Sequence, residues 1–202
     1  GAVSNYPNTD GFHLVHLAWS RDLKSWKRLD GRPPFIGPSR RDSGAYDLTQ
    51  ILGPSDAVVR GDELWFYYTG YKAVHTDFSN TFALGLAVSK LDRLIGRATP
   101  EGEGGLLLTR PLSWQGDAVE VNVSSADGAI QVEVLSEQGE IVAGYERTSS
   151  MVFSGDSLRQ QMQWKDGRTM GALNGRRVRL KFYLSNATLY SFAIKNVHNL
   201  GE

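Results

Sequence analysis

The sequence contains no cysteine, carries no net charge and has no long apolar run. The absence of cysteine excludes disulfides, thiolate metal ligands and a cysteine nucleophile, and it leaves the redox compartment open. Lys+Arg and Asp+Glu balance at 22 each, so electrostatics give no reason to expect nucleic acid or an anionic membrane as a partner. No segment approaches the roughly 18 to 20 apolar residues of a membrane span. We therefore expect a soluble protein; its compartment stays undetermined, and a secreted or periplasmic location is compatible with the composition.

Helical periodicity is also missing, because no stretch of a dozen residues repeats its apolar positions every 3.6 residues. Apolar and polar residues instead alternate with period two, the pattern of half-buried strands. Turn pairs such as Asp127-Gly128 and Asn174-Gly175 separate these runs. The pattern predicts an all-β protein. The clearest alternating runs are Ala118–Val123, Ile130–Leu135, Val178–Leu184 and Leu189–Ile194.

A change of composition predicts two domains. The segment from Ala98 to Gly105 is rich in Gly and Glu, aromatic residues dominate before it, and short regular strands follow it. We place the boundary near residue 104. The second part, residues 104–202, has the strand number and spacing of a β-sandwich.

Several elements of the first part occur together in the order known from one group of proteins. They are the "LA-SRD-W-R" element from Leu17 to Arg28, the "G-x-(aromatic)-D" element from Gly44 to Asp47, and "GDELWFYYTG" from Gly61 to Gly70. In this order the chain resembles the C-terminal part of five-bladed β-propeller proteins related to glycoside hydrolase families 32 and 43. The resemblance implies a partial β-propeller in residues 1–103, followed by the C-terminal β-sandwich in residues 104–202.

The length of the first part limits what the resemblance implies. One propeller blade needs about 40 to 50 residues, so residues 1–103 hold one to two blades. The family places its catalytic carboxylates mainly on the first three blades, so those residues have no counterpart in this chain. Open sheet edges and an uncovered apolar face are arrangements that proteins avoid. We therefore expect a homo-oligomer, or association with the missing blades.

Asp47 is the candidate catalytic residue, with Tyr46 and Gln50 as candidate substrate-binding residues beside it. A carboxylate next to an aromatic residue is suited to holding sugar hydroxyls or to raising a partner's pKa. The alternative is that Asp47 caps a turn by accepting backbone N–H groups. Glu63 is a second candidate carboxylate, although its position in a turn favours a side chain that points to solvent.

His75 lies in the long polar loop after Tyr71 and is a candidate for substrate contact, because loops on a rigid scaffold collect binding residues. We expect no metal site, since His13 and His16 point to opposite faces of a strand. We expect no cofactor; a structural calcium ion is compatible with the resemblance, but no residue cluster demands one.

Four aromatic residues of the second part have two interpretations. They could form a platform for carbohydrate, or they could pack between two sheets as core. The second interpretation is the ordinary fate of large aromatic side chains. The residues are Trp114, Tyr145, Trp164 and Tyr190.

Three functional hypotheses remain open from the sequence. The first is a glycoside hydrolase-like protein that acts on the glycosidic bonds of a carbohydrate, with Asp47 lining the propeller funnel. The second is a non-catalytic carbohydrate-binding or assembly module, favoured by the missing blades and by the lack of an obvious second carboxylate. The third is association of several copies, with a site at their interface.

Overall fold

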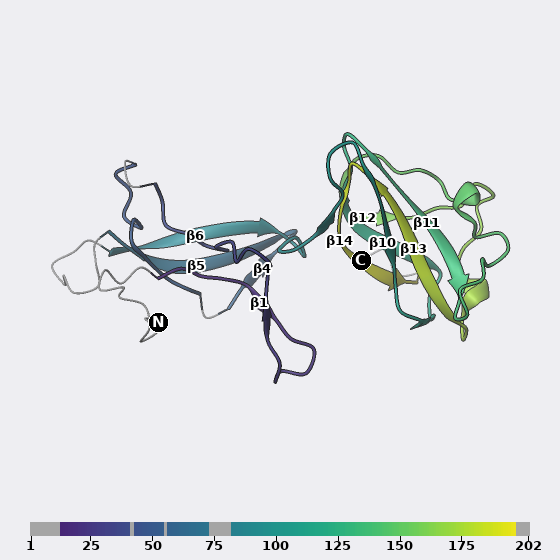
Figure 1. Cartoon of the computed structure of the whole chain (residues 1–202), viewed down its shortest axis with the longest axis horizontal. Helices are drawn as coiled ribbons and strands as arrows, with labels where there is room; N and C mark the ends of the chain where they lie inside the picture. Colours follow the sequence, from purple (N-terminus) through teal and green to yellow (C-terminus); the bar gives the residue numbers. More distant parts are fainter. Residues whose placement is uncertain (1–12, 41–42, 55, 73–81, 197–202) are drawn as a thin grey trace. The chain divides into compact units, whose positions relative to one another are not determined.

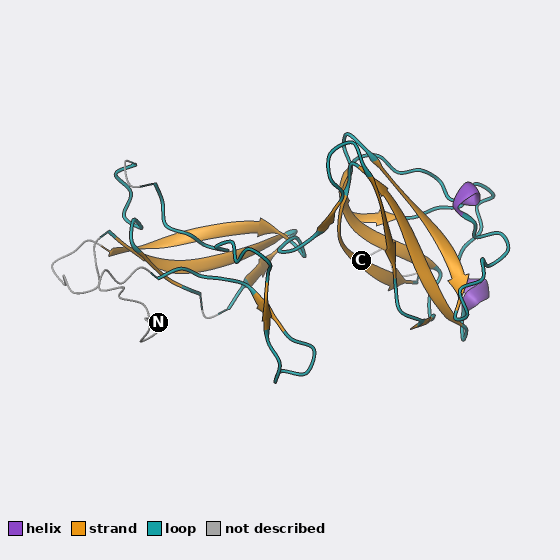
Figure 2. Ribbon diagram, in the orientation of Figure 1, coloured by secondary structure: helices purple, strands orange, loops and turns teal. Residues whose placement is uncertain are grey.

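The computed structural model describes residues 13–40, 43–54, 56–72 and 82–196. All regular structure in these residues is strand, apart from two short 3-10 turns, η1 (Arg147–Ser149) and η2 (Gly171–Leu173) (Figure 2). The sheets are antiparallel, and none of those formed by the described residues closes on itself. The prediction of an all-β protein is confirmed.

The chain divides into two compact units, Gly1–Ser89 and Lys90–Glu202. The composition shift predicted the change near residue 104, and the division by contacts falls earlier. The reason is β7 (Arg97–Ala98), which pairs with β14 (Thr188–Lys195) and so contributes to a sheet of the second unit.

The first unit is built around one long strand, β5 (Glu63–Tyr71), which lies beside β6 (Phe82–Lys90) in Figure 1. Two short strands pair with opposite ends of β5. β3 (Gln50–Leu52) pairs with its C-terminal end, and β4 (Val58–Arg60) pairs with its N-terminal end through the Gly61-Asp62 turn. A separate hairpin joins β1 (Ala18–Trp19) to β2 (Lys27–Arg28).

One face of the β5–β6 sheet leaves large apolar side chains exposed. Alternate residues of a strand share a face, and the rings of Tyr71 and Phe82 lie 5.7 Å apart, so the odd positions of β5 and the even positions of β6 point the same way. Leu84 is 78% exposed on this face. Contiguous apolar surface of this kind marks an interaction site in soluble proteins. The exposed apolar residues of this face are Tyr67, Phe82, Leu84, Leu86 and Val88.

The second unit contains two four-stranded sheets. The first has the order β12 (Asp156–Gln161), β10 (Ala118–Ser124), β14 and β7. The second has the order β11 (Ala129–Ser136), β13 (Arg177–Ser185) and β8 (Gly104–Leu108), with β9 (Leu112–Ser113) also paired to β13.

Both sheets of the second unit contribute to one hydrophobic core. Their alternating apolar residues, such as Val121 of β10 and Phe182 of β13, are fully buried. Trp114, Tyr145 and Trp164 also lie in this core, and the rings of the last two meet edge to face with centroids 5.0 Å apart. These three aromatics therefore pack as core and are not available as a carbohydrate platform.

Candidate functional site

Asp47 lies just before β3, and its side chain is buried, with 5% of its surface exposed. The Tyr68 hydroxyl donates a hydrogen bond of 2.9 Å to Oδ2 of Asp47. The other carboxylate oxygen, Oδ1, is buried without a hydrogen-bond partner in the structure. The partner found for this carboxylate is a tyrosine hydroxyl of β5, so Asp47 is not the turn cap that was the alternative interpretation.

Two tyrosines extend this contact into a chain of hydroxyl groups. The oxygens of Tyr46 and Tyr68 lie 3.3 Å apart, and Tyr68 in turn bonds Asp47. Burial raises the pKa of Tyr68 above its ordinary value, and the hydrogen bonds with Tyr46 and Asp47 raise it further. Tyr68 therefore keeps its proton and remains a donor throughout the physiological pH range.

Glycines allow the tyrosines and Asp47 to approach β5 and β6. A Cβ atom at Gly70 would overlap the Cβ of Asp47 and lie 2.9 Å from the ring of Tyr46. A Cβ at Gly85 of β6 would overlap the ring of Tyr68 and the hydroxyl of Tyr46. The "YYTG" sequence thus supplies both the tyrosine that holds Asp47 and the glycine that makes room for it.

Gln50 is the second buried polar group of the site, with 5% of its surface exposed. Its Oε1 lies 3.1 Å from Nδ1 of His13, while its Nε2 is buried without a partner among the residues that the structure describes. Almost all buried side-chain polar atoms in proteins are hydrogen-bonded, so each exception calls for an explanation. Here an unpaired acceptor on Asp47 and an unpaired donor on Gln50 lie three residues apart on the segment that leads into β3.

A hydroxyl group can satisfy either of these two unpaired atoms. It can donate its proton to a carboxylate oxygen and accept a hydrogen bond from an amide nitrogen. The adjacent hydroxyls of a sugar offer several such groups in one rigid ring. The site is therefore chemically suited to a polyhydroxylated ligand.

The structure does not bring Glu63 to this site. Glu63 is exposed at the opposite end of β5 and accepts a hydrogen bond of 2.7 Å from Nε1 of Trp65. Five residues separate it from Tyr68, a distance of about 17 Å along an extended strand. The paired carboxylates of glycosidases lie about 5 to 9.5 Å apart. Glu63 is consequently not in position to act with Asp47. It lies at the start of strand β5 and not in the preceding turn, and its side chain is exposed, as in a surface residue.

His75, the last candidate residue named from the sequence, lies outside the described residues. Asp22 accepts hydrogen bonds from the backbone N–H groups of Lys24 and Ser25, which lower its pKa to about 2, so it shapes the turn between β1 and β2. Within the described ranges no group of three or more His, Asp or Glu residues is arranged to hold a metal ion. No helix in the same ranges has the length and apolar character needed to cross a bilayer.

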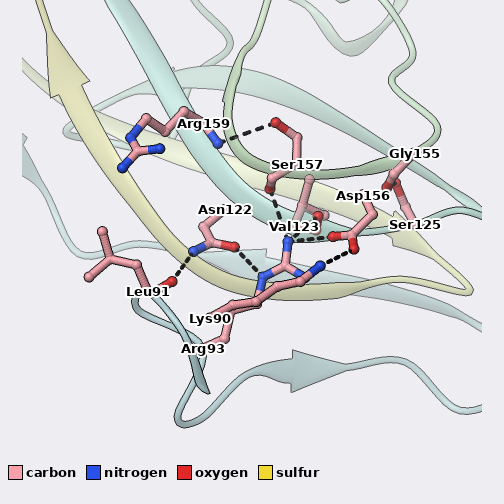
Figure 3. A network of polar contacts seen from close by, with 10 residues as sticks. All are labelled: Lys90, Leu91, Arg93, Asn122, Val123, Ser125, Gly155, Asp156, Ser157 and Arg159. Atoms are coloured by element: carbon pink, nitrogen blue, oxygen red, sulfur yellow. Dashed lines mark hydrogen bonds and ion pairs between the residues drawn. The ribbon is translucent and has the colours of Figure 1, made fainter. Parts of the chain in front are cut away.

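A second polar cluster, centred on Arg93, lies in the second unit (Figure 3). Its Nε donates to Oδ1 of Asn122 at 2.7 Å, and its Nη2 donates to the backbone carbonyls of Val123 and Ser157 at 3.2 Å. Its guanidinium also pairs with Asp156, and its Cζ lies 4.8 Å from the ring centre of Tyr190.

The Arg93 cluster is structural, because its polar groups satisfy one another. Asn122 uses its amide nitrogen to bond the carbonyl of Leu91 at 2.8 Å, and Lys90 bonds Asp156 at 2.7 Å. The cluster therefore fastens residues 90–93 to strands β10 and β12. Sequence reasoning missed it, since the partners are 29 to 66 residues apart and no local pattern joins them.

Searches against protein-family models, curated proteins and solved structures find no match for this chain.

Proposed function

We propose that this protein binds carbohydrate through the Asp47 site, as part of a glycoside hydrolase-like protein with one to two propeller blades followed by a β-sandwich. The observation that carries the proposal is the pair of buried, unpaired polar atoms, Oδ1 of Asp47 and Nε2 of Gln50. Leaving such atoms unpaired costs about 1 to 3 kcal/mol each, and a bound hydroxyl removes that cost. The sequence elements that surround Asp47 and Tyr68 support the assignment to this family.

Tyr46 and Tyr68 contribute aromatic rings to the site. Aromatic rings pack against the C–H groups of sugars, and Tyr68 fixes one oxygen of Asp47 so that the other is free to accept. The proposed role of Asp47 is thus to orient a sugar hydroxyl, with Gln50 donating to the same or a neighbouring hydroxyl.

Hydrolysis is the second candidate function. It needs a second carboxyl group, and Glu63 does not supply one. The exposed apolar face of β5 and β6 favours this candidate, because a partner that covers the face, either a second copy or further blades, brings additional side chains to the first unit.

Titration of a panel of mono- and oligosaccharides tests the proposal, with Asp47→Asn and Tyr68→Phe measured beside the parent protein. Glu63→Gln is the matched control, since it removes a carboxylate of the same unit outside the site. We expect the Asp47 variant to lose at least about tenfold in affinity, and the Glu63 variant to bind like the parent. Equal binding by the parent and by Asp47→Asn contradicts the proposal.

The same variants separate binding from hydrolysis when aryl glycosides replace the free sugars. Turnover that disappears in Asp47→Asn supports hydrolysis. Turnover per chain that rises with protein concentration indicates an active site formed between copies of the chain. Sugar binding without turnover supports a non-catalytic binding module.

A further inference from the structure

The outer face of the sheet β11–β13–β8 presents side chains that decrease in size along the strands. Side chains on this face point away from the core, because the intervening residues, such as Val132 and Phe182, are core residues. The first row has long side chains, the second row contains an aromatic ring, and the third row consists of small residues. In register across the three strands, the rows are Glu133–Lys181–Leu108, Gln131–Tyr183–Leu106 and Ala129–Ser185–Gly104.

The row of small residues leaves a hollow of about 390 Å³ on the surface of the sheet. Gly104 and Ser185 line it together with the larger side chains of Tyr183 and Leu106. Its volume lies in the lower part of the range for small-ligand sites. A single sugar ring is small enough to fit within it.

Arg147 of η1 supplies the charge of the hollow. Its Nε donates to Oε1 of Gln131 at 3.1 Å, and its Cζ lies 4.3 Å from the ring centre of Tyr183. Gln131 in turn donates to the backbone carbonyl of Arg147 at 3.2 Å. The guanidinium is therefore held in place by a hydrogen bond on one edge and an aromatic ring against its plane.

The terminal nitrogens of Arg147 remain available to a ligand. They make no hydrogen bond and no ion pair with any residue in the described ranges. The neighbouring charges are already compensated, since Glu133 accepts from Tyr183 at 2.9 Å and lies 3.6 Å from Lys181. Among the residues that line the hollow, Arg147 is the one that carries charge.

We propose that this hollow binds a carboxylate-bearing sugar ring, that is, a uronic acid residue. The two terminal nitrogens of a guanidinium match the two oxygens of a carboxylate, which makes the pair stronger and more selective than a contact with a neutral group. Leu106 and the edge of Tyr183 provide an apolar wall for the C–H face of the ring, and the Ser185 hydroxyl provides a partner for its hydroxyls. The proposal goes beyond the Asp47 site, because every residue of the hollow belongs to the second unit.

Binding of galacturonate and glucuronate, with galactose and glucose as neutral counterparts, tests this proposal by calorimetric or ligand-observed NMR titration of the full chain. We expect the parent protein to prefer the acids by about tenfold or more. Arg147→Gln removes the preference. Gly104→Leu fills the hollow and abolishes binding of all four sugars at this site; its Cβ has the Leu184 carbonyl oxygen at 3.7 Å as nearest neighbour, so the backbone accepts the side chain.

Arg176→Gln is the matched control, because Arg176 is exposed at the turn before β13, at the opposite end of that strand from Ser185. This variant removes the same charge and should bind the acids like the parent. Circular dichroism and thermal unfolding establish that all variants are folded before binding is compared.

Four results with the parent protein and the Arg176 variant overturn the proposal. They are equal binding of acidic and neutral sugars, binding of acetate as tight as that of the uronates, no binding of uronate, and an equal loss in Arg176→Gln. A further comparison, with Asp47→Asn, distinguishes binding in the hollow from binding at the Asp47 site. Uronate binding that persists in Asp47→Asn supports the hollow, whereas uronate binding that disappears there assigns the ligand to Asp47 and overturns the inference about Arg147.

Discussion

The Tyr68 hydroxyl donates to one oxygen of Asp47 at 2.9 Å, and the second oxygen of the same buried carboxylate has no partner. A buried carboxylate is costly unless its oxygens are hydrogen-bonded. Tyr68 meets half of this requirement, and Oδ1 has no partner among the described residues. The contact thus fixes the orientation of Asp47 without filling the site.

The first prediction concerns the ionisation of Tyr68. Its pKa is raised in the folded protein, so the stability that the neutral ring provides is complete below the ordinary tyrosine pKa of about 10 and is lost as the pH rises through the folded value. Asp47→Asn removes a charge and a hydrogen bond that raise this pKa, so Tyr68 should then ionise at lower pH. Ultraviolet titration of tyrosinate measures the change, and Tyr68→Phe identifies the signal. A Tyr68 signal that coincides with exposed tyrosines contradicts the prediction.

The second prediction concerns the close contact at Gly70. Gly70→Ala places a Cβ against the backbone and side chain of Asp47, so we expect a loss of about 1 to 3 kcal/mol in the free energy of unfolding and weaker sugar binding. Denaturant unfolding of the parent and the variant measures the first effect. Gly104→Ala is the control for the unfolding measurement, since the nearest neighbour of its added Cβ would be the Leu184 carbonyl oxygen at 3.7 Å. Equal stability of Gly70→Ala and the parent would show that Asp47 moves aside freely.

The third prediction concerns Asp156 and acid. Hydrogen bonds from Arg93 and Lys90 lower the pKa of Asp156, so its contribution is complete above the ordinary carboxyl pKa of about 3.9 and is lost as the pH falls through the lower folded value. Because Asp156 is partly exposed, Asp156→Asn should cost at most about 1 kcal/mol at neutral pH. The difference from the parent should shrink below about pH 4.

Unfolding by denaturant across this pH range checks the prediction about Asp156. Asp166→Asn is the control, because Asp166 pairs with the exposed Arg168 two residues away and holds no distant segment. A difference between Asp156→Asn and the parent that is constant with pH would show that the charge of Asp156 is not responsible.

The fourth prediction concerns the apolar face of the β5–β6 sheet. Leu84→Lys places a charge at its most exposed residue, so any association through this face should weaken and light scattering should shift towards the monomer. The substitution costs little folding energy, since the side chain is already in water. Ile141→Lys, at an exposed apolar residue of the second unit, is the control. A parent protein that is monomeric at every concentration contradicts self-association through this face.

The sequence predicted the elements of the second unit well because their period-two patterns are long. In β13 the buried residues alternate as expected, so its two faces follow directly from the residue order, whereas β10 is also buried at Asn122, which bonds Arg93. β7 escaped prediction, since two residues carry no periodicity and their pairing with β14 involves residues about ninety positions away. The boundary consequently falls before residue 104.

The candidate site was predicted in part. Asp47 and Gln50, named from the sequence as candidate site residues, are both buried in the structure, but the partner of Asp47 was not foreseen. Tyr68 lies 21 residues further along, and only the pairing of β3 with β5 brings it close. Glu63, in contrast, lies on the same strand as Tyr68 but far from Asp47. It is at the other end of that strand, and its side chain points to the opposite face from that of Tyr68.

The pairing of β7 with β14 has a practical consequence for dissecting the protein. A fragment cut at the composition boundary, near residue 104, would lose Arg93 together with β7 and would expose the backbone edge of β14. Uncovered strand edges recruit other chains, so such a fragment should aggregate on expression. A fragment that starts at Lys90 keeps both features and is therefore the better choice for producing the second unit alone.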